Sequence, residues 1–558
     1  MQLPLHAPIS RNAGVSAVEV AALHKSMSGA GVMRMFNHDK LPISIAVALI
    51  AILATVACSP DNRHAPLDAA VESVLIRGVQ IVDGTGKAAF AGDVRVAKGT
   101  ITDVGSLAAR DGDRIVEGRG LTLAPGFIDT HSHADRDLLD QPGALPAVTQ
   151  GITTIVVGQD GGSEMPLTDF FASLEAAPAA INVASYVGHN TLRSAVLGKE
   201  HRRKATEDEI EAMGELLGQE LASGALGLSS GLEYEPGIWS DPAEVLTLAK
   251  LTAARGGRYI SHVRSEDRWF EQALDEIINI GRVTGMPVQV SHIKLAMKRL
   301  WGETPRIIAK LDAARAEGVQ ITADIYPYEY WQSNLMVLLP ERDYTDRAAI
   351  AEALDQIAPP DGLWLTQFDP EPGYVGKTLT EIAKLRDVDA VAAFMYLAQA
   401  SEQMEEQTGK GADAIIGTSM REDDIQRMLL WPETNICTDG AFDDLHPRAR
   451  GAFPRVLGRY VREQKLLTLE EAVHKMTLLA AEHMGFEDRG VIRAGARADL
   501  VLFDPHTVID LATPQSPELL SVGIDTVWVG GQSVYEDGRE TGARPGVVIR
   551  REPASSPQ

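Results

Sequence analysis

The chain has 558 residues and a formal net charge of −25, from 52 Lys and Arg against 77 Asp and Glu. That length requires one large domain or two to three ordinary ones, and a hydrophobic content of 45% excludes the disordered class. The negative charge argues against nucleic acid as a partner, because phosphate binding needs clustered positive charge. The chain has two cysteines, Cys58 and Cys437, which excludes a disulfide framework and any multi-cysteine zinc or iron–sulfur site.

The N-terminal segment is typical of a sorting signal. Residues 41–57 are uncharged and mostly apolar, which fits the hydrophobic part of a signal peptide and lies at the short edge for a membrane-spanning helix. Cys58 resembles the lipid acceptor of a bacterial lipoprotein. We therefore expect a signal over residues 1–58, a tether over 59–72, and a periplasmic protein anchored to a bacterial membrane by a lipid on Cys58. The alternative is an uncleaved anchor helix, and a start at Met33 or Met35 would give a more ordinary signal length.

Both ends of the remaining chain are rich in strand patterns. Short apolar runs broken by turns occupy residues 73–119, and a matching set follows residue 498. Two all-β segments at opposite ends favour one small β-sandwich built from residues 73–122 and 495–552.

Between these ends the sequence repeats a strand, a loop and a helix. Eight apolar runs end in polar residues, mostly about 30 residues apart, as a parallel (β/α)₈ TIM barrel requires. They cover residues 126–133, 153–160, 182–190, 224–231, 258–264, 288–294, 319–328 and 434–440. We expect this barrel over residues 123–494, with an insertion around 340–430 over its mouth. A doubly wound open sheet is the alternative, but no glycine-rich nucleotide loop follows the first strand.

Four of the 14 histidines fall where predicted strands end. His131 and His133 are two residues apart and so face the same side of a strand. His262 and His292 end two successive strands, and Asp439 ends the last one. Neutral imidazoles and carboxylates suit zinc and similar divalent ions. Histidines that merely satisfy a core would not gather at equivalent strand ends, so the pattern predicts a metal site at the barrel mouth.

These motifs resemble the amidohydrolase superfamily and, within it, the N-acyl-D-amino-acid deacylase (D-aminoacylase) family. The resemblance extends from about residue 73 to 550. It is carried by APGFIDTHSH (124–133), QGITTIVVG (150–158), GALGLSSGLEYEPG (224–237), YISHVR (259–264), VSHIK (290–294), DIYPY (324–328), TDG (438–440), HPRARGAFPRVLGRYVRE (446–463) and ADLVLFDP (498–505).

The resemblance implies one or two zinc or similar ions. It makes His131 and His133 ligands of one ion, and His262 and His292 ligands of the other. It makes Asp439 both a ligand and the catalytic acid–base. It also implies that the substrate's carboxylate is held by Lys294, Tyr326 and the Gln332–Ser333 region.

One position departs from the family. Typical members carry a metal-bridging cysteine in a Gly-Asn-Cys-Gly run, whereas this chain has Gly158-Gln159-Asp160-Gly161. A carboxylate at Asp160 can bridge two hard divalent ions. Alternatively Asp160 is a loop residue and one tightly held ion remains. No lysine ends the fourth strand, which argues against a carbamylated-lysine bridge.

Several other residues are candidates either for contact with the substrate or for a structural role. Tyr234 either points its phenol at the reacting carbonyl or packs against Pro236. Lys294 shares the face of His292 and either clamps a carboxylate or is solvated, and Arg421 is a candidate second positive charge. His189 resembles a structural position more than a ligand. Residues 446–462 are expected to brace the insertion without taking part in the chemistry.

The predicted function is hydrolysis of a linear amide, by attack of metal-bound hydroxide with Asp439 moving the proton. The substrate would be a small molecule, either an N-acyl amino acid, for which we expect the D configuration, or a dipeptide. A cyclic-amide hydrolase of dihydroorotase or hydantoinase type is one alternative, although the missing strand-four lysine and the YPY segment argue against it. An inactive, surface-tethered binding lipoprotein is another, although no expected ligand is lost.

Overall fold

The computed structural model describes residues 73–551. The predicted signal, the tether and the lipid acceptor Cys58 lie outside the described residues. Within residues 73–551, no helix is long and apolar enough to cross a membrane.

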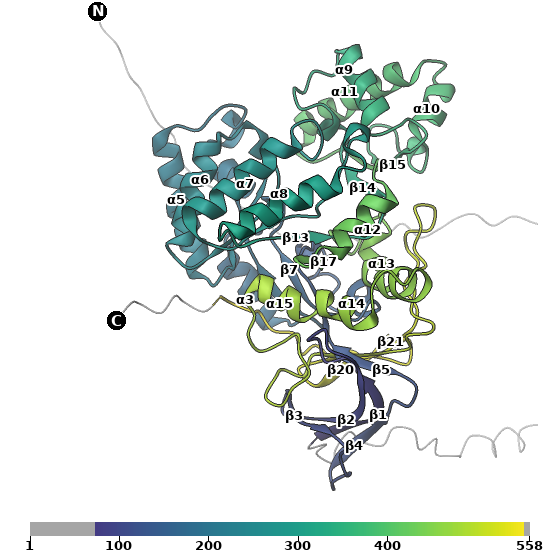
Figure 1. Ribbon diagram of the computed structural model, residues 1–558. Coiled ribbons are helices and arrows are strands. Elements are labelled where there is room, and N and C mark those ends of the chain that lie inside the picture. The colour runs from purple at the N-terminus through teal and green to yellow at the C-terminus, as the bar shows by residue number, and fades with distance from the viewer. Residues whose placement is uncertain (1–72, 552–558) are drawn as a thin grey trace, which may run out of the picture. The chain divides into compact units, whose positions relative to one another are not determined.

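Strands from both ends of the chain pair in one nine-stranded sheet, at the bottom of Figure 1. The two ends meet where β18 runs antiparallel to β5, with Leu502 opposite Leu123. A separate apolar core, which includes Ile81, Val94 and Trp528, packs on this sheet. The pairing gives one sheet, so the expected two-layered sandwich is not confirmed. Its strands are β1 (Ser73–Ile81), β2 (Phe90–Ala97), β3 (Thr100–Gly105), β4 (Asp113–Glu117), β5 (Thr122–Pro125), β18 (Leu500–Phe503), β19 (Ile524–Val529), β20 (Gln532–Glu536) and β21 (Arg539–Glu540).

The middle of the chain is an α/β fold with two parallel sheets, of order β6-β7-β8 and β9-β10-β11-β12-β13-β17. Each of the eight predicted runs contains a strand of these sheets. Only Tyr186 separates β8 from β9. No strand pairing joins β17 to β6 among the described residues, although Asp439 N–H donates to His131 O (2.8 Å) and His133 N–H to Gly440 O (3.0 Å). The strands are β6 (Phe127–Asp129), β7 (Ile152–Val157), β8 (Asn182–Ser185), β9 (Val187–Gly188), β10 (Gly227–Gly231), β11 (Arg258–His262), β12 (Val288–Val290), β13 (Ile321–Ile325) and β17 (Thr434–Ile436).

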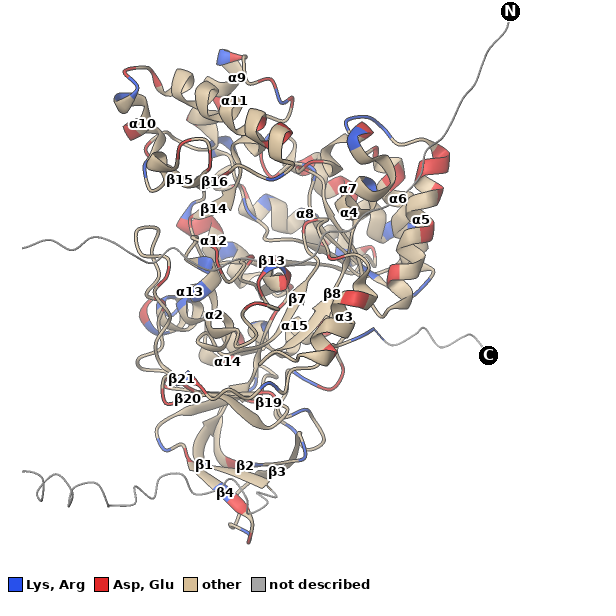
Figure 2. Ribbon diagram, turned by 180° about the vertical axis from the view of Figure 1, so that it is seen from behind, with Lys and Arg blue, Asp and Glu red and all other residues tan. Residues whose placement is uncertain are grey.

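Amphipathic helices connect these strands. In α7 the buried residues Phe270, Leu274, Ile277 and Ile278 follow helical spacing, which turns one apolar face to the sheet. The helix α5 begins with a capping box formed by Thr206 and Glu209, and Figure 2 shows acidic residues along it. The helices of this part are α2 (Leu145–Val148), α3 (Leu167–Ala176), α4 (His189–Leu197), α5 (Glu207–Ala222), α6 (Pro242–Ala253), α7 (Phe270–Thr284), α8 (Thr304–Ala316), α12 (Glu422–Leu430), α13 (Arg448–Arg455), α14 (Leu469–Met476) and α15 (Leu478–Met484).

The long gap between β13 and β17 contains a subdomain of its own, at the top right of Figure 1. An antiparallel sheet of β14 (Tyr330–Ser333), β16 (Asp413–Thr418) and β15 (Leu363–Phe368) packs with three helices. These helices are α9 (Arg347–Gln356), α10 (Leu379–Leu385) and α11 (Ala390–Thr408). The first strand, β14, starts only a few residues after β13 ends and bears Gln332 and Ser333.

Candidate active site

The six predicted metal ligands meet at the carboxyl ends of the parallel strands. His131 and His133 follow β6, Asp160 follows β7, His262 ends β11, His292 follows β12 and Asp439 follows β17. Parallel strands place their carboxyl ends on one face, which is where such folds assemble functional side chains.

Three of these residues have left-handed backbone conformations. The φ angles are 52° at Asp160, 32° at His292 and 50° at Asp439. Residues other than glycine rarely adopt this region, and such strain concentrates at functional sites. The chain therefore bends sharply just after three strands, at the residues whose side chains enter the cluster.

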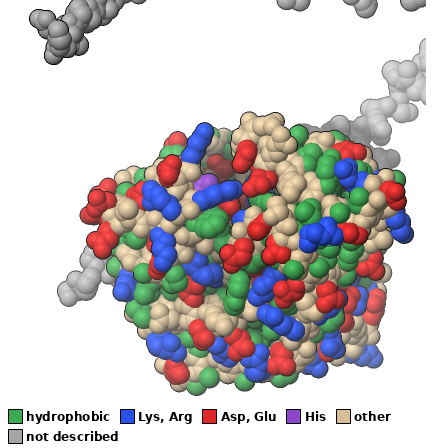
Figure 3. Space-filling model, turned by 90° about the horizontal axis from the view of Figure 1, so that it is seen from above, with side chains coloured by type: hydrophobic (Ala, Val, Ile, Leu, Met, Phe, Trp, Pro, Cys, Tyr) green, Lys and Arg blue, Asp and Glu red, His purple; other side chains and the backbone are tan. Residues whose placement is uncertain are grey.

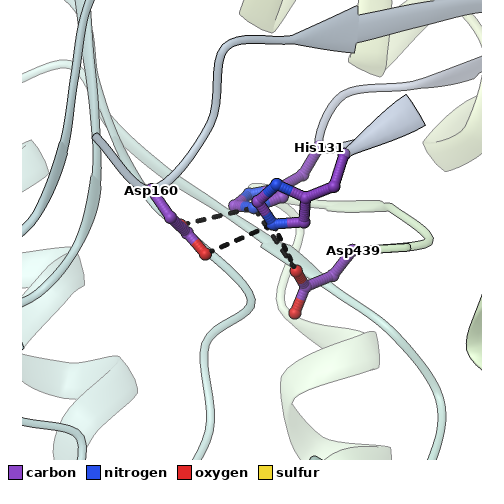
Figure 4. Close-up of side chains that lie close together, drawn as sticks. His131, Asp160 and Asp439 are labelled. Carbon is purple, nitrogen blue, oxygen red and sulfur yellow. Dashed lines mark ion pairs between the residues drawn. The ribbon is translucent and has the colours of Figure 1, made fainter. Parts of the chain in front are cut away.

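Asp160 and Asp439 flank the first histidine pair. His131 Nε2 lies 3.3 Å from Asp160 and 3.5 Å from Asp439, and Figure 4 shows the two carboxylates about this imidazole. His133 Nε2 lies 3.5 Å from Asp160 and 3.2 Å from Asp439. One ligand atom from each of the four residues falls within 4.8 Å of the others, a spacing that could hold a metal ion.

Asp160 also contacts the second histidine pair. Both of its carboxylate oxygens lie 3.3 Å from His292 Nε2, and His262 Nδ1 lies 3.2 Å from the same nitrogen. These three residues form a second group with metal-ligand spacing. Asp160 thus belongs to both groups, at the position where the resemblance implies a bridging ligand.

Two buried glutamates, which the sequence analysis did not single out, support the second pair. Glu233 lies 3.0 Å from His262 Nε2, and Glu266 lies 3.0 Å from His292 Nδ1. Lys294 Nζ donates to both oxygens of Glu266 at 2.6 and 2.7 Å. Glu233 lies in the GLEY run of residues 231–234, so the family motif could have identified it. No sequence pattern pointed to Glu266.

A buried carboxylate on β13 ties several strands together beneath the cluster. Asp324 accepts hydrogen bonds from the His292 N–H (2.5 Å) and from Gln289 Nε2 (2.6 Å). The same carboxylate lies 3.2 Å from Cys437 Sγ and 3.8 Å from His131 Nδ1. A carboxylate behind a histidine fixes ring orientation at metal sites, so Asp324 positions His131 and His292.

The electrostatics of the cluster are dominated by buried charges of opposite sign. Burial opposes the charged form of His131, but the carboxylates of Asp160 and Asp324 outweigh it and raise the pKa of His131 well above its usual value. Burial likewise opposes ionisation of Asp160, yet His131 and His292 hold the Asp160 pKa well below its ordinary range. Burial lowers the pKa of His262 to about 4, so this imidazole is neutral at pH 7.

The donor set fits a divalent ion. His131 is fully buried, and neither of its ring nitrogens has a hydrogen-bond partner. At these distances the two carboxylates would repel each other, and the imidazole nitrogens would lack hydrogen-bond partners. Bound protons or a bound cation would remove both costs. Nitrogen and oxygen ligands of this kind are those that zinc takes.

A cationic and phenolic wall stands beside the cluster. Arg448 Nη1 donates to Asp439 at 2.5 Å, and its guanidinium lies 4.6 Å from the centre of the Tyr326 ring. Lys294 Nζ lies 5.7 Å from the same ring, and the buried Tyr326 hydroxyl has no hydrogen-bond partner. Residues 446–462 were expected only to brace the insertion. For Arg448 the structure adds a contact that this prediction did not include, because the turn after His446 directs its guanidinium at Asp439.

Tyr234 and Ser333 lie at the same cavity. Both line the two hollows that meet at Asp439 and Arg448, and the Tyr234 ring centre is 4.2 Å from that of His262. Arg421 lines a small cavity together with His292, Lys294 and Tyr326, and its half-exposed side chain pairs with Asp423 at the start of α12. His189 pairs with Glu244 at 2.8 Å, inside a buried group that includes Arg193. The molecule's upper face mixes acidic and basic side chains (Figure 3).

The comparisons with known proteins agree with this geometry. The chain matches the Amidohydrolase family over residues 114–430 and 433–535. It is 38% identical to the N-acyl-D-glutamate deacylase of Alcaligenes xylosoxydans xylosoxydans, over 86% of this chain and 96% of that protein. It is 36% identical to the N-acyl-D-aspartate deacylase of the same organism, over 85% and 94%.

A solved structure is similar along nearly the same length. The N-acyl-D-glutamate deacylase of Bordetella bronchiseptica, complexed with zinc and a phosphonate mimic of the tetrahedral intermediate, is 37% identical. It superposes with a TM-score of 0.76, covering 86% of this chain and 99% of that one. The chain belongs to the amidohydrolase family. Within that family it falls among the N-acyl-D-amino-acid deacylases.

Proposed function

We propose that this protein hydrolyses the linear amide bond of N-acyl-D-amino acids, with zinc or a similar divalent ion. The observation that carries the proposal is the meeting of two histidine pairs at Asp160, directly beside Asp439 and Arg448. Relatives named as deacylases of N-acyl-D-glutamate and N-acyl-D-aspartate support the reaction and the D configuration.

We further propose that the parallel strands close into a (β/α)₈ barrel. The two backbone hydrogen bonds between the ends of β6 and β17 support closure, since they join the outer strands of the two parallel sheets. Asn435 Nδ2 also donates to the Thr130 hydroxyl across this seam. The same seam has Asp439 beside both His131 and His133.

In this proposal His131 and His133 would hold one ion and His262 and His292 another, with the Asp160 carboxylate lying between the two pairs. A bound divalent ion would supply an acidified water and polarise the substrate carbonyl. Tyr234, whose ring lies tilted against that of His262, faces the same cavity and can donate its phenolic proton to the carbonyl oxygen of the amide.

Asp439 moves the proton. Burial opposes its ionisation, but Arg448 and the histidines keep its pKa below the ordinary value, so its carboxylate is charged and able to accept a proton from the attacking water. The water oxygen bonds to the acyl carbon, the C–N bond breaks, and Asp439 delivers the proton to the departing nitrogen. Amine expulsion needs this general-acid assistance. The products are a carboxylic acid and a free D-amino acid.

Arg448, Lys294 and Tyr326 hold the carboxylate of the amino-acid part. Arg448 presents a planar donor pair, Lys294 a compact charge, and Tyr326 a buried hydroxyl without a partner. Ser333, on β14, offers a further hydroxyl at the same cavity. Fixing the carboxylate orients the scissile amide toward the histidine cluster.

The experiment that tests the function is a substrate panel with metal analysis. Purified protein is assayed with N-acetyl-D- and N-acetyl-L-amino acids, D-containing dipeptides and cyclic amides, while its metal content is measured. We expect turnover of the acyclic D substrates and one to two equivalents of divalent ion. Turnover of hydantoins or dihydroorotate alone would favour the cyclic-amide alternative, and binding without any turnover would favour an inactive protein.

We also propose that the mature protein is held at a bacterial membrane by a lipid on Cys58, facing the periplasm. The apolar run 41–57 ending in Ala57-Cys58 supports this. Cys58→Ser should abolish lipid labelling and release the protein from membranes. If the variant stays membrane-bound at the same mature mass, the segment is an anchor helix.

A further inference from the structure

The cavity beside Arg448 and Tyr326 has an apolar end. Trp331, Val337, Leu338 and Ile357, all from the long segment between β13 and β17, line it together with Ala296. Leu338 is 1% exposed and Trp331 7% exposed, so this lining is firmly packed. We infer that this end receives the side chain of the substrate's amino-acid part, and that the enzyme prefers neutral, apolar D-amino-acid residues over D-glutamate and D-aspartate. The inference rests on the proposed function.

Among the described residues that line this cavity, no cation is left for a second carboxylate. Of its lining residues, Lys294 and Arg448 are the cations, and each is already paired, with Glu266 and Asp439 respectively. Glu233 and Asp267 add two further acids to the same wall. The substrate's α-carboxylate uses the cationic wall. A side-chain carboxylate would then be buried among apolar groups and acids, which is strongly unfavourable.

Arg342 is a further cation on the same segment, but both of its terminal nitrogens are held by backbone oxygens. Nη2 donates to the backbone oxygen of Glu233 (3.0 Å) and Nη1 to that of Leu339 (3.1 Å). Arg342 is not among the residues that line the cavity. Its guanidinium therefore holds the loop between α9 and β14 in place and does not face the substrate.

The position of the apolar end indicates that it receives the amino-acid side chain of the substrate and not the acyl group. The α-carboxylate and the side chain leave the same carbon atom, and the apolar residues adjoin the carboxylate-holding wall. A second hollow on the His133 and Asp160 side is polar, with Gln159 and Asn190 in its lining. The acyl group extends into that open, polar hollow, so the apolar end is left for the side chain.

The first test needs no variant. The zinc-loaded protein is assayed with N-acetyl-D-leucine, N-acetyl-D-glutamate and N-acetyl-D-alanine. We expect kcat/KM for the leucine substrate to exceed that for the glutamate substrate by at least about 100-fold, because a pocket without a partner rejects a buried charge. Equal or faster turnover of the glutamate substrate overturns the inference while leaving the deacylase function intact. If even N-acetyl-D-alanine is not hydrolysed, the proposed function fails as well.

A second test moves the specificity. Val337 is half-buried, and Val337→Lys places a cation at the apolar end; Val337→Met is the matched neutral control. We expect Val337→Lys, but not Val337→Met, to shift the leucine-to-glutamate ratio toward glutamate by about 10-fold or more. Turnover of N-acetyl-D-alanine reports that each variant folds and carries metal. An unchanged ratio in an active Val337→Lys protein contradicts the inference. The inference is also contradicted if Val337→Lys changes the rate according to the acyl length of N-acyl-D-alanines and not according to the amino-acid side chain.

Discussion

Asp160 offers the sharpest single perturbation of the site, because its carboxylate contacts both histidine pairs. Asp160→Asn keeps the size of the side chain and removes its charge. Asparagine also tolerates the left-handed backbone at this position better than alanine or cysteine would. The variant therefore separates loss of the ligand from backbone strain.

The size of the effect follows from the geometry. The Asp160 oxygens lie 3.3 to 3.5 Å from nitrogens of His131, His133 and His292, so any ion held by these imidazoles lies within about 4 Å of the carboxylate. One unit charge at that distance is worth about 4 kcal/mol at an effective dielectric constant of 20. Loss of mere outer-sphere partners costs 10- to 100-fold in affinity. We expect affinity for the weaker ion to fall by at least about 100-fold and the bound stoichiometry to fall to one or fewer.

The assay is a titration of zinc and manganese into metal-free wild type and Asp160→Asn, followed by calorimetry and by metal content after desalting. The matched control is Asp444→Asn, which removes a carboxylate from the same cavity mouth but outside the ligand groups. Superimposable titration curves for wild type and Asp160→Asn would refute the bridging role and make Gln159-Asp160 a loop only. Because a carboxylate is a harder ligand than the thiolate typical of the family, we also expect manganese to be accepted more readily.

The remaining predictions concern the proton shuttle, substrate binding, the pH dependence of metal affinity, and stability. Asp439→Asn should retain metal on the histidines but lose about 10²- to 10⁴-fold in kcat, and near-normal turnover would assign the proton transfer elsewhere. Arg448→Lys should raise KM about 10-fold or more because the planar donor pair is lost, and an unchanged KM would remove it from carboxylate binding. The pKa of His292 is raised to about 9 despite burial, mainly by Asp160 and Asp439, and the pKa of His131 is also raised. Since imidazoles bind metal only after losing this proton, metal affinity should increase with pH up to about 9, and a pH-independent affinity by calorimetry would contradict this. Glu244→Gln removes the only carboxylate that pairs with the buried Arg193 among the described residues, so it should cost about 3 to 5 kcal/mol in the free energy of unfolding, measured by urea denaturation, with metal content unchanged.

Much of the parallel core could be predicted because its signal is local. Runs such as 288–294 are short, apolar and end in polar residues, and the strand inside each is found, though often shorter than the run, as in β12 (Val288–Val290). The pairing of the two chain ends also followed from their matching strand patterns. The single nine-stranded sheet did not follow, since which strands pair across a sheet depends on contacts between segments hundreds of residues apart.

The site was predictable where spacing carried the information. His131 and His133, two residues apart, and His262 and His292, at successive strand ends, needed only the periodicity of a parallel fold. Arg448 and Glu266 were missed because they reach the cluster from a helix start and a loop, where no period fixes the direction of a side chain. The ion pair of Arg421 with Asp423 could not be predicted for the same reason, since it forms in the turn before α12.

The central claim is that the histidine cluster and its metal hydrolyse acyclic D substrates. The most direct measurement follows hydrolysis of an N-acetyl-D-amino acid while zinc is added back stepwise to chelator-stripped protein, with the L enantiomer run in parallel. We expect negligible turnover without metal, recovery that saturates at one to two equivalents, and strong preference for the D enantiomer. Full activity of the stripped protein, or equal turnover of both enantiomers, would contradict the account.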